Sequence, residues 1–311
     1  MYDVIALGEL LVDLAERAKD ENGYPTLAAN PGGAPGNFLA ALSAYGKKTA
    51  FLAKVGDDTF GHLLTGTMRR AGIDTRGILI SPETFTTLAF VTFDAHGDRS
   101  FAFARKPGAD TQLTFDELDL SLIDETRVFH FGTLSLTGEP ARTTTYRAVE
   151  YAKAHGKLVT YDPNLRKPLW NDLNEAKEQM LWGLRQADVV KISDEEVEFL
   201  FGLGVQDGAQ YILDHYPVKL VFVTCGADGC WFQNRNAGGH VDSLKDIKVV
   251  DTTGAGDIFG GSAVWKLLQT GKRPEDLDEA ELTQIVSFAC RAAGLSTTKH
   301  GGISSVPDSI S

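Results

Sequence analysis

Cysteine is scarce in this sequence, and its spacing excludes a disulfide scaffold. The 311 residues contain three cysteines, Cys225, Cys230 and Cys290. No two of them have the C-x-x-C spacing of a redox or zinc motif, and an odd number cannot all pair in disulfides. Because intracellular proteins keep their thiols reduced, we expect a protein of the cytoplasm.

Positive charge and long apolar runs are also scarce. Thirty Lys and Arg against 42 Asp and Glu give a formal net charge of −12. This balance disfavours nucleic acids and anionic membrane surfaces as partners, because both require a basic footprint. No run of about 18 apolar residues could span a bilayer, and the first residues lack the basic leader of a secretory signal. We therefore expect a soluble protein with neither a nucleic-acid nor a membrane partner.

Two familiar phosphate-binding motifs are absent. A P-loop requires G-x-x-x-x-G-K-[ST], but Gly46-Lys47 and Gly156-Lys157 lack the preceding glycine and the following hydroxyl. A dinucleotide fingerprint requires G-x-G-x-x-G after the first strand, where Gly8 is followed by Glu-Leu-Leu. Gly254-Ala255-Gly256 lacks the third glycine of that fingerprint. These absences exclude a P-loop enzyme and a dehydrogenase that carries the dinucleotide fingerprint.

Short apolar runs alternate with helical patterns along the chain. The runs are nearly continuous and rich in β-branched residues, as in strands that are covered on both faces. They lie at 4–7, 50–55, 127–131, 157–162, 187–192 and 219–224. Helical patterns lie at 36–45 and 141–155, and apolar residues at helical spacing recur at Leu282, Ile285, Val286, Ala289 and Ala293. This alternation predicts an α/β fold with βαβ units and a mostly parallel sheet.

Residues 85–105 interrupt the alternation. They read as two β segments joined by the turn 94–98, with no helix between them. Phe101 and Phe103 are two residues apart, so both side chains point to the same face. We predict a small second sheet, completed by residues 10–30, that acts as a lid over a site. An ordinary solvent-facing hairpin is the alternative.

Three loops of small residues follow predicted strands or precede predicted helices, at 30–37 (NPGGAPGN), 223–229 (VTCGADG) and 251–257 (DTTGAGD). The backbone N–H groups of such loops, and the positive end of the helix predicted after 251–257, favour a bound anion. In an open α/β sheet these loops gather at the carboxyl ends of the strands, where ligands bind. Asp257 then lies beside the anion, although an acidic residue in a first helical turn can also serve only the helix dipole.

Together these motifs resemble the ribokinase-like (PfkB) family of carbohydrate kinases over nearly the whole chain. The family's two signatures match at 32–37 (GGAPGN) and 251–257 (DTTGAGD). Within the family, the stretches 99–110 (RSFAFARKPGAD) and 161–170 (YDPNLRKPLW) are most similar to bacterial fructokinases. The match of several separate motifs in the expected order makes the resemblance specific.

By that resemblance the chain is one ribokinase-like domain, residues 1–311, with a three-layer α/β/α fold and a lid inserted at about 10–30 and 85–106. The resemblance makes Asp257 the general base and assigns Arg166 to catalysis. Gly254, Ala255 and Gly256 form the anion hole. The sugar site comprises Asp13, Gly32, Gly33, Asn37, Phe101, Phe103, Asp162 and Arg166. The nucleotide site comprises Lys191, Thr224, Gly226, Gly229, Gly256 and Ala289.

The family resemblance also implies ATP, Mg²⁺ and a monovalent cation such as K⁺. Glu196 is expected to hold Mg²⁺ through water, and Asp251 and Thr253 to hold the monovalent cation. The family often has N-x-x-E where this chain has Ser193-Asp194-Glu195-Glu196, so the glutamate is present and the asparagine is not. Members of the family often pair through an exposed lid sheet, which predicts a homodimer.

The resemblance predicts ATP-dependent phosphorylation of D-fructose to fructose 6-phosphate. The alternative substrate is 2-keto-3-deoxygluconate, an acidic sugar that would require a cation from Arg105, Lys106 or Arg166. Ribokinase fits less well because its loop carries a lysine where Ala34 stands. A catalytically silent sugar-binding regulator is the alternative outside the enzymes, and the intact Asp257 argues against it.

Overall fold

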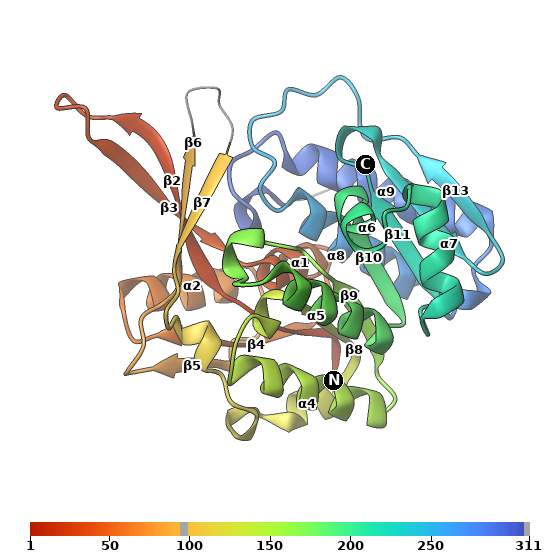
Figure 1. Ribbon diagram of the computed structural model, residues 1–311, viewed down its shortest axis with the longest axis horizontal. Helices are drawn as coiled ribbons and strands as arrows, with labels where there is room; N and C mark the ends of the chain where they lie inside the picture. Colours follow the sequence, from red (N-terminus) through yellow and green to blue (C-terminus); the bar gives the residue numbers. More distant parts are fainter. Residues whose placement is uncertain (94–98, 308–311) are drawn as a thin grey trace.

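The computed structural model describes residues 1–93 and 99–307, with the side chains of 92, 93 and 99–101 left out. Its large sheet has the strand order β13-β12-β11-β10-β9-β8-β1-β4-β5 (Figure 1). Neighbouring strands are parallel from β5 to β11, and β12 and β13 are antiparallel at one edge. The strands are β1 Tyr2–Leu7, β4 Thr49–Gly56, β5 Ile78–Ser81, β8 Thr126–Gly132, β9 Leu158–Asp162, β10 Val189–Ser193, β11 Leu220–Thr224, β12 Cys230–Asn234 and β13 Gly238–Val241.

The large sheet forms from the apolar runs that the sequence shows. All six predicted runs fall in strands, namely β1, β4, β8, β9, β10 and β11. Side chains on both faces are buried, as in β4, where Ala50, Phe51, Leu52 and Ala53 have no exposed surface. Burying apolar area stabilises the folded protein by roughly 25 cal/mol per Å², so these strands form the hydrophobic core. The prediction of a mostly parallel sheet is confirmed.

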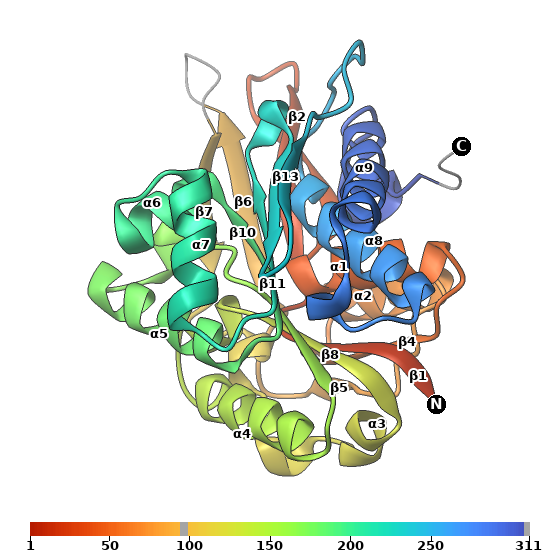
Figure 2. The ribbon, with the colours of Figure 1, turned by 90° about the vertical axis from the view of Figure 1, so that its right-hand side faces the viewer.

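Helices cover both faces of this sheet (Figure 2). The layer on one face contains α3 Leu120–Asp124, α4 Ala141–Ala154, α5 Leu173–Gln186, α6 Asp194–Phe201 and α7 Val205–His215. The layer on the other face contains α1 Ala34–Ala44, α2 Thr59–Arg70, α8 Ala255–Thr270 and α9 Glu279–Ser296. The predicted stripe on α9 is confirmed, since Leu282, Ile285, Val286 and Ala289 are buried and Ala293 is partly buried. The three-layer α/β/α architecture is therefore as expected.

A second, smaller sheet stands apart from the large one. Its strands are β2 Leu11–Lys19, β3 Pro25–Gly32, β6 Leu88–Phe93 and β7 Arg99–Ala104, in the order β3-β2-β6-β7. We call it the lid sheet. Figure 1 shows the β2–β3 hairpin projecting from the body of the protein. Since β2 follows β1 after Gly8, Glu9 and Leu10, the lid sheet starts at the carboxyl end of a central strand. Among the described residues, no helix is long and apolar enough to cross a bilayer.

Candidate active site

A cavity of about 230 Å³ lies between the lid sheet and the loops at the carboxyl ends of the central strands. Alternate residues of β2 line it, namely Leu11, Asp13, Ala15 and Arg17, as the two-residue period of a strand predicts. Glu16 also lines it, next to an irregularity in the pairing of β2 with β3. Other lining residues come from segments far apart in the sequence: the start of α1, with Gly33, Ala34 and Asn37; the turn after β9, with Asn164 and Arg166; the start of α8, with Asp251, Thr252, Thr253, Gly254 and Asp257; and the C-terminal segment, with His300 and Gly301. The fold thus brings the first and last motifs of the chain to one place.

Asp257 lies in the first turn of α8 and lines this cavity. Nδ2 of Asn37 donates a hydrogen bond of 2.8 Å to Oδ2 of Asp257. Burial raises the pKa of the Asp257 carboxyl, and the charge of Lys191, the Asn37 hydrogen bond and the charge of Arg166 oppose that increase. A desolvated carboxylate holds a proton more readily than one in water. Asp257 therefore has the position and the environment of a general base.

The turn before Asp257 forms a backbone cradle. Gly254 has φ 76°, a left-handed conformation that favours glycine. A Cβ at Gly254 would lie 2.8 Å from Cα of Gly302 and 3.0 Å from Nδ2 of Asn37, so no larger residue fits. The first N–H groups of an α-helix have no acceptor within the helix, and α8 begins at Ala255. The helix dipole adds positive potential at this end, so the cradle can bind phosphate.

A buried ion pair lies next to the cradle. Nζ of Lys191 is 3.1 Å from Oδ2 of Asp162, and a Cβ at Gly256 would lie 3.0 Å from the same Nζ. Burial raises the pKa of Asp162 to about 7, against the charge of Lys191. Burial lowers the pKa of Lys191, but the charges of Asp162, Glu196 and Asp257 more than offset this and leave it raised. We therefore take Lys191 as an ammonium held at the edge of the cradle by its carboxylate neighbours.

Glu196 organises the turn after β9. Its Oε1 accepts a hydrogen bond of 2.7 Å from the N–H of Leu165, and its Oε2 accepts one of 2.9 Å from the N–H of Ser193. Ser193, which stands where the family often has asparagine, caps α6 by accepting from the N–H of Glu196. The pair forms a capping box. Both carboxylate oxygens of Glu196 thus accept hydrogen bonds from backbone N–H groups, and one of these belongs to Leu165, the residue before Arg166.

Asp251 organises the loop before α8 in a similar way. Its Oδ1 accepts hydrogen bonds from N–H and Oγ1 of Thr253, at 3.0 and 2.7 Å. Its Oδ2 accepts from the N–H of Gly301 at 3.1 Å, which joins this loop to the C-terminal segment. Within the described residues, no group of three or more His, Cys, Asp or Glu side chains is arranged to hold a metal ion. The monovalent-cation and magnesium sites stay predictions.

Comparison with known proteins agrees with this geometry. The sequence pattern of the pfkB family carbohydrate kinases matches residues 1–309. The chain belongs to that family. It is 42% identical to fructokinase-1 from Zea mays over 308 residues, which cover 98% of this chain and 94% of that protein. It is therefore a sugar kinase.

Solved structures of the family share the fold. Fructokinase from Xylella fastidiosa with bound ATP superimposes with a TM-score of 0.90 at 28% identity, covering 99% of this chain and 96% of that one. Fructokinase from Vibrio cholerae, with fructose, ADP and calcium ion bound, gives a TM-score of 0.85 at 31% identity, covering 98% and 96%. Both match over nearly the whole chain, so the ribokinase-like fold is confirmed.

Most of the sugar-site residues that the sequence predicts lie together in this kinase. Asp13, Gly33, Asn37, Phe103 and Arg166 line the cavity. Burial raises the pKa of Asp13 to about 6, the charge of Arg166 lowers it, and Asp257 and Asp251 raise it. A Cβ at Gly32 would collide with Asp13, so glycine is needed beside that carboxylate. Asp162 lies behind the cradle and does not line the cavity, and the side chain of Phe101 lies outside the described residues. The roles of all these residues stay predictions.

The predicted nucleotide residues lie in a different part of the structure. Thr224 ends β11, and Gly226 and Gly229, with φ 54° and 97°, form the turn to β12. None of them lines the cavity described above. Ala289 is fully buried on α9, so its side chain packs in the core. Of this set only Lys191 and Gly256 are adjacent to the base.

Several lining residues were missed by the sequence motifs. Glu9, Arg17 and His300 line the cavity but belong to no signature of the family. Arg17 follows Asp13 by four residues, so the alternation along β2 is a signal that could have found it. Nη1 of Arg17 lies 2.8 Å from Nδ1 of His300, a contact between the lid sheet and the body that no local pattern predicts.

Proposed function

We propose that this kinase is an ATP-dependent fructokinase that forms fructose 6-phosphate, with Asp257 as the general base. The observation that carries the proposal is the position of Asp257: it is hydrogen-bonded to Asn37 in the loop 32–37, lines the cavity and follows the backbone cradle directly. A base, a cradle for an anion and a cavity for an acceptor therefore adjoin. Phosphoryl transfer requires these parts in line.

In the proposed mechanism the chain positions the reactants and stabilises negative charge. The acceptor hydroxyl of the sugar donates to Asp257, which takes the proton as the new O–P bond forms. The bond between the γ-phosphorus and the bridging oxygen of ATP breaks, and ADP is the leaving group. The N–H groups at Gly254, Ala255 and Gly256, with Arg166 and Lys191 nearby, stabilise the charge on the phosphoryl oxygens. General-base help is worth roughly 10²–10⁴-fold, and one oxyanion donor roughly 10²–10³-fold. Base and cradle thus contribute comparably.

We propose that ATP binds along the loop 224–229 and against α9, with its terminal phosphate in the cradle. The relatives support ATP as the nucleotide, since one has ATP bound and another ADP. Glu196 would hold Mg²⁺ through water, which suits a carboxylate whose oxygens already accept backbone N–H groups. Mg²⁺ would supply Lewis-acid stabilisation of the phosphate charge. Asp251 and Thr253 would hold K⁺ in the loop that their hydrogen bonds organise.

A neutral sugar fits the charges of the cavity better than 2-keto-3-deoxygluconate does. Of the three cations that the sequence offers for an acidic sugar, Arg105 is buried in an ion pair with Asp110, at 2.7 Å from Nη2 to Oδ2. Lys106 is exposed and does not line the cavity. Arg166 does line it, as does Arg17 on β2, so the acidic sugar stays the second candidate. Asp13 supplies a carboxylate that suits hydroxyl groups.

One assay of ADP release separates all the candidate substrates and the silent regulator. ADP release would be measured with purified protein, ATP and Mg²⁺ against fructose, 2-keto-3-deoxygluconate, ribose, mannose and adenosine. We expect the highest kcat/KM with fructose. A higher value with 2-keto-3-deoxygluconate would replace the proposed substrate. No stimulation by any sugar would favour the silent regulator and overturn the proposal.

We also propose that residues 1–311 form a single domain and that the protein acts in the cytoplasm. We further propose that it is a homodimer whose two copies pair through the lid sheet. Tyr24 and Leu27 on the β2–β3 hairpin are 68% and 42% exposed, and apolar residues at an exposed sheet favour pairing. Light scattering would give the mass in solution. A monomer at micromolar concentration, or a dimer that persists after Tyr24→Ser and Leu27→Ser, would contradict this pairing.

A further inference from the structure

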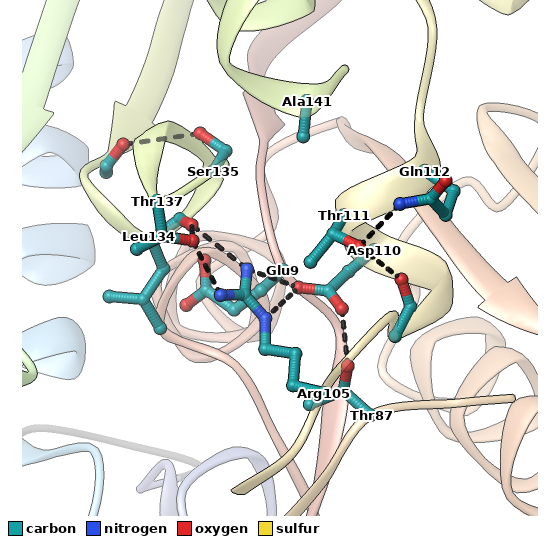
Figure 3. A network of polar contacts seen from close by, with 12 residues as sticks. Glu9, Thr87, Arg105, Asp110, Thr111, Gln112, Leu134, Ser135, Thr137 and Ala141 are labelled. Atoms are coloured by element: carbon teal, nitrogen blue, oxygen red, sulfur yellow. Dashed lines mark hydrogen bonds and ion pairs between the residues drawn. The ribbon is translucent and has the colours of Figure 1, made fainter. Parts of the chain in front are cut away.

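A buried polar network lies where the lid sheet joins the body of the protein (Figure 3). Arg105, just after β7, donates from Nε to Oδ2 of Asp110 at 2.9 Å and from Nη2 to the carbonyl of Leu134 at 3.0 Å. Oδ1 of Asp110 accepts a hydrogen bond of 2.5 Å from Oγ1 of Thr87, just before β6. The network therefore ties the beginning of β6 and the end of β7 to the body. We call Glu9, Thr87, Arg105 and Asp110 the lid root.

Glu9 is the member of the lid root that reaches the loop 32–37. It is 2% exposed, lies between β1 and β2 and lines the cavity. Its Oε1 accepts a hydrogen bond of 2.9 Å from the N–H of Ala34, the first residue of α1. The N-cap of α1 is Gly33, which has no side chain to supply this bond. Glu9 therefore caps α1 from another segment, in the place of an N-cap side chain.

The backbone of Glu9 also supports the loop. Gly33 has φ 111°, and a Cβ there would collide with the carbonyl oxygen of Glu9. The chain thus packs directly against Glu9 at the point where β3 ends and α1 begins. Asn37, which holds Asp257, follows one helical turn later and donates from its N–H to the carbonyl of Gly33 at 3.1 Å. A displacement at Ala34 would therefore reach the base.

Capping α1 with a buried charge costs stability. Burial raises the pKa of Glu9 to about 7 from an ordinary 4.5, while the backbone N–H bonds and the charge of Arg105 lower it and Asp110 raises it. Arg105 and Asp110 are the charged groups that act on Glu9, and the Arg105 guanidinium forms its ion pair with Asp110. Between about pH 4.5 and 7 the folded protein binds more protons than the unfolded chain, so this group lowers stability as pH rises through that window. A neutral residue of the same shape would cost less.

We propose that Glu9 is a positioning residue of the sugar site, whose ionised carboxylate holds the Gly33–Ala34 peptide, and through it Asn37, in the arrangement that binds the sugar. The inference rests on the proposed function of the cavity as a sugar site. An anion is favoured at the N-terminus of α1, and a charged acceptor makes a stronger hydrogen bond than a neutral one. Protonation of Glu9 therefore loosens the loop 32–37.

The variant Glu9→Gln tests this, because it keeps the shape and an acceptor oxygen but removes the charge. We expect the KM for fructose at pH 8 to rise roughly 5–10-fold, the difference between charged and neutral acceptors, with the KM for ATP within about twofold. The wild-type KM for fructose should rise as pH falls below about 7, and the variant should lose that part of the rise. The melting temperature at pH 8 should be kept or raised, whereas a purely structural glutamate would lower it on replacement.

A matched control is Asp58→Asn. Asp58 caps the neighbouring helix α2 by accepting from the N–H groups of Phe60 and Gly61, both at 2.9 Å, but it does not line the cavity. We expect this variant to lose stability and to keep the KM for fructose within about twofold. An equal rise in both variants, or an unchanged KM in Glu9→Gln, would overturn the proposal.

Hydrogen exchange separates this inference from the proposed function, because it needs no substrate. At pH 8 the amides of Ala34, Gly36, Asn37 and Phe38 should exchange faster in Glu9→Gln than in the wild type, and Asp58→Asn should match the wild type there. If the wild type does not phosphorylate fructose, the proposed function fails while this measurement still stands. Unchanged exchange at 34–38 would show that Glu9 does not hold the loop.

Discussion

Asp257 and Asp162 are both carboxylates next to the cradle at the start of α8, the first half-buried and the second buried, but their partners differ. Asp257 is bound by the neutral amide of Asn37 and lines the cavity. Asp162 is bound by the ammonium of Lys191 and does not line it. If Asp162 took up a proton, a buried cation would be left without its partner, and this is costly. Asp257 can take up a proton without that cost, so the partner decides which aspartate can act as a base.

Replacing Asp257, the carboxylate that accepts from Asn37, should have the largest effect on activity. Asp257→Asn keeps the shape but removes the proton acceptor. We therefore expect kcat to fall by roughly 10²–10⁴-fold, which is the usual contribution of a general base. ADP affinity measured by calorimetry should stay within about twofold. A residual kcat within tenfold of the wild type would contradict the assignment of the base.

Breaking the ion pair should affect stability first. Lys191→Met leaves Asp162 buried without its cation, which should lower the free energy of unfolding by about 3–5 kcal/mol, measured by urea denaturation. Asp162→Leu combined with Lys191→Met should recover most of that loss. Lys272→Met is the control, because Lys272 and Glu281 form an exposed pair and such pairs are worth about 0–1 kcal/mol. Equal losses for both lysines would mean that burial does not distinguish these pairs.

Removing the side-chain amide of Asn37 should change the pH dependence of kcat/KM. In Asn37→Leu, Asp257 loses a hydrogen bond that favours its ionised form, so its pKa should rise. Hydrogen bonds to charged groups are stronger than those between neutral groups, so the change should be large enough to measure. The acid limb of the kcat/KM profile should therefore move to higher pH, and activity near neutrality should fall. A limb that stays in place would show that Asn37 acts on the sugar alone.

An exposed contact at the same cavity should matter least. Arg17 on the lid sheet and His300 on the body are both exposed, so their contact should be worth no more than an exposed ion pair, about 0.2–1 kcal/mol. Arg17→Ala should raise the KM for fructose less than about fivefold, and Lys19→Ala on the same strand should leave it unchanged. A larger rise would mean that Arg17 binds the sugar itself.

The fold was predictable because its strands and helices leave local patterns of apolar residues along the sequence. Nearly continuous apolar runs predict parallel strands, and the missing helix in 85–105 predicts a separate sheet. The loops 32–37 and 251–257 were also visible, since glycine is needed where the backbone approaches closely, as at Gly254. Asp13, Asn37, Arg166 and Asp257 lie at one cavity for these reasons, whereas Asp162 and the residues of the loop 224–229 do not line it.

The pairing of charges was not predictable. The sequence offers Arg105 as a cation for an acidic sugar, but in the structure Asp110, five residues later, holds it in a buried pair. Loops have no period, so spacing does not reveal such a contact. Glu9 was missed for a similar reason: its partner Ala34 is 25 residues away, and only the folded chain brings the carboxylate to the start of α1.

The hydrogen bond between Asn37 and Asp257 joins residues that are 220 positions apart. At a synthesis rate of roughly 5–20 residues per second, the ribosome adds Asp257 ~10–40 s after Asn37. During that interval the nascent chain carries the sugar loop without the base, and so it has no means of transferring phosphate. A chain cut short before α8 would lack both the cradle and Asp257, so on the proposed mechanism it would transfer no phosphate.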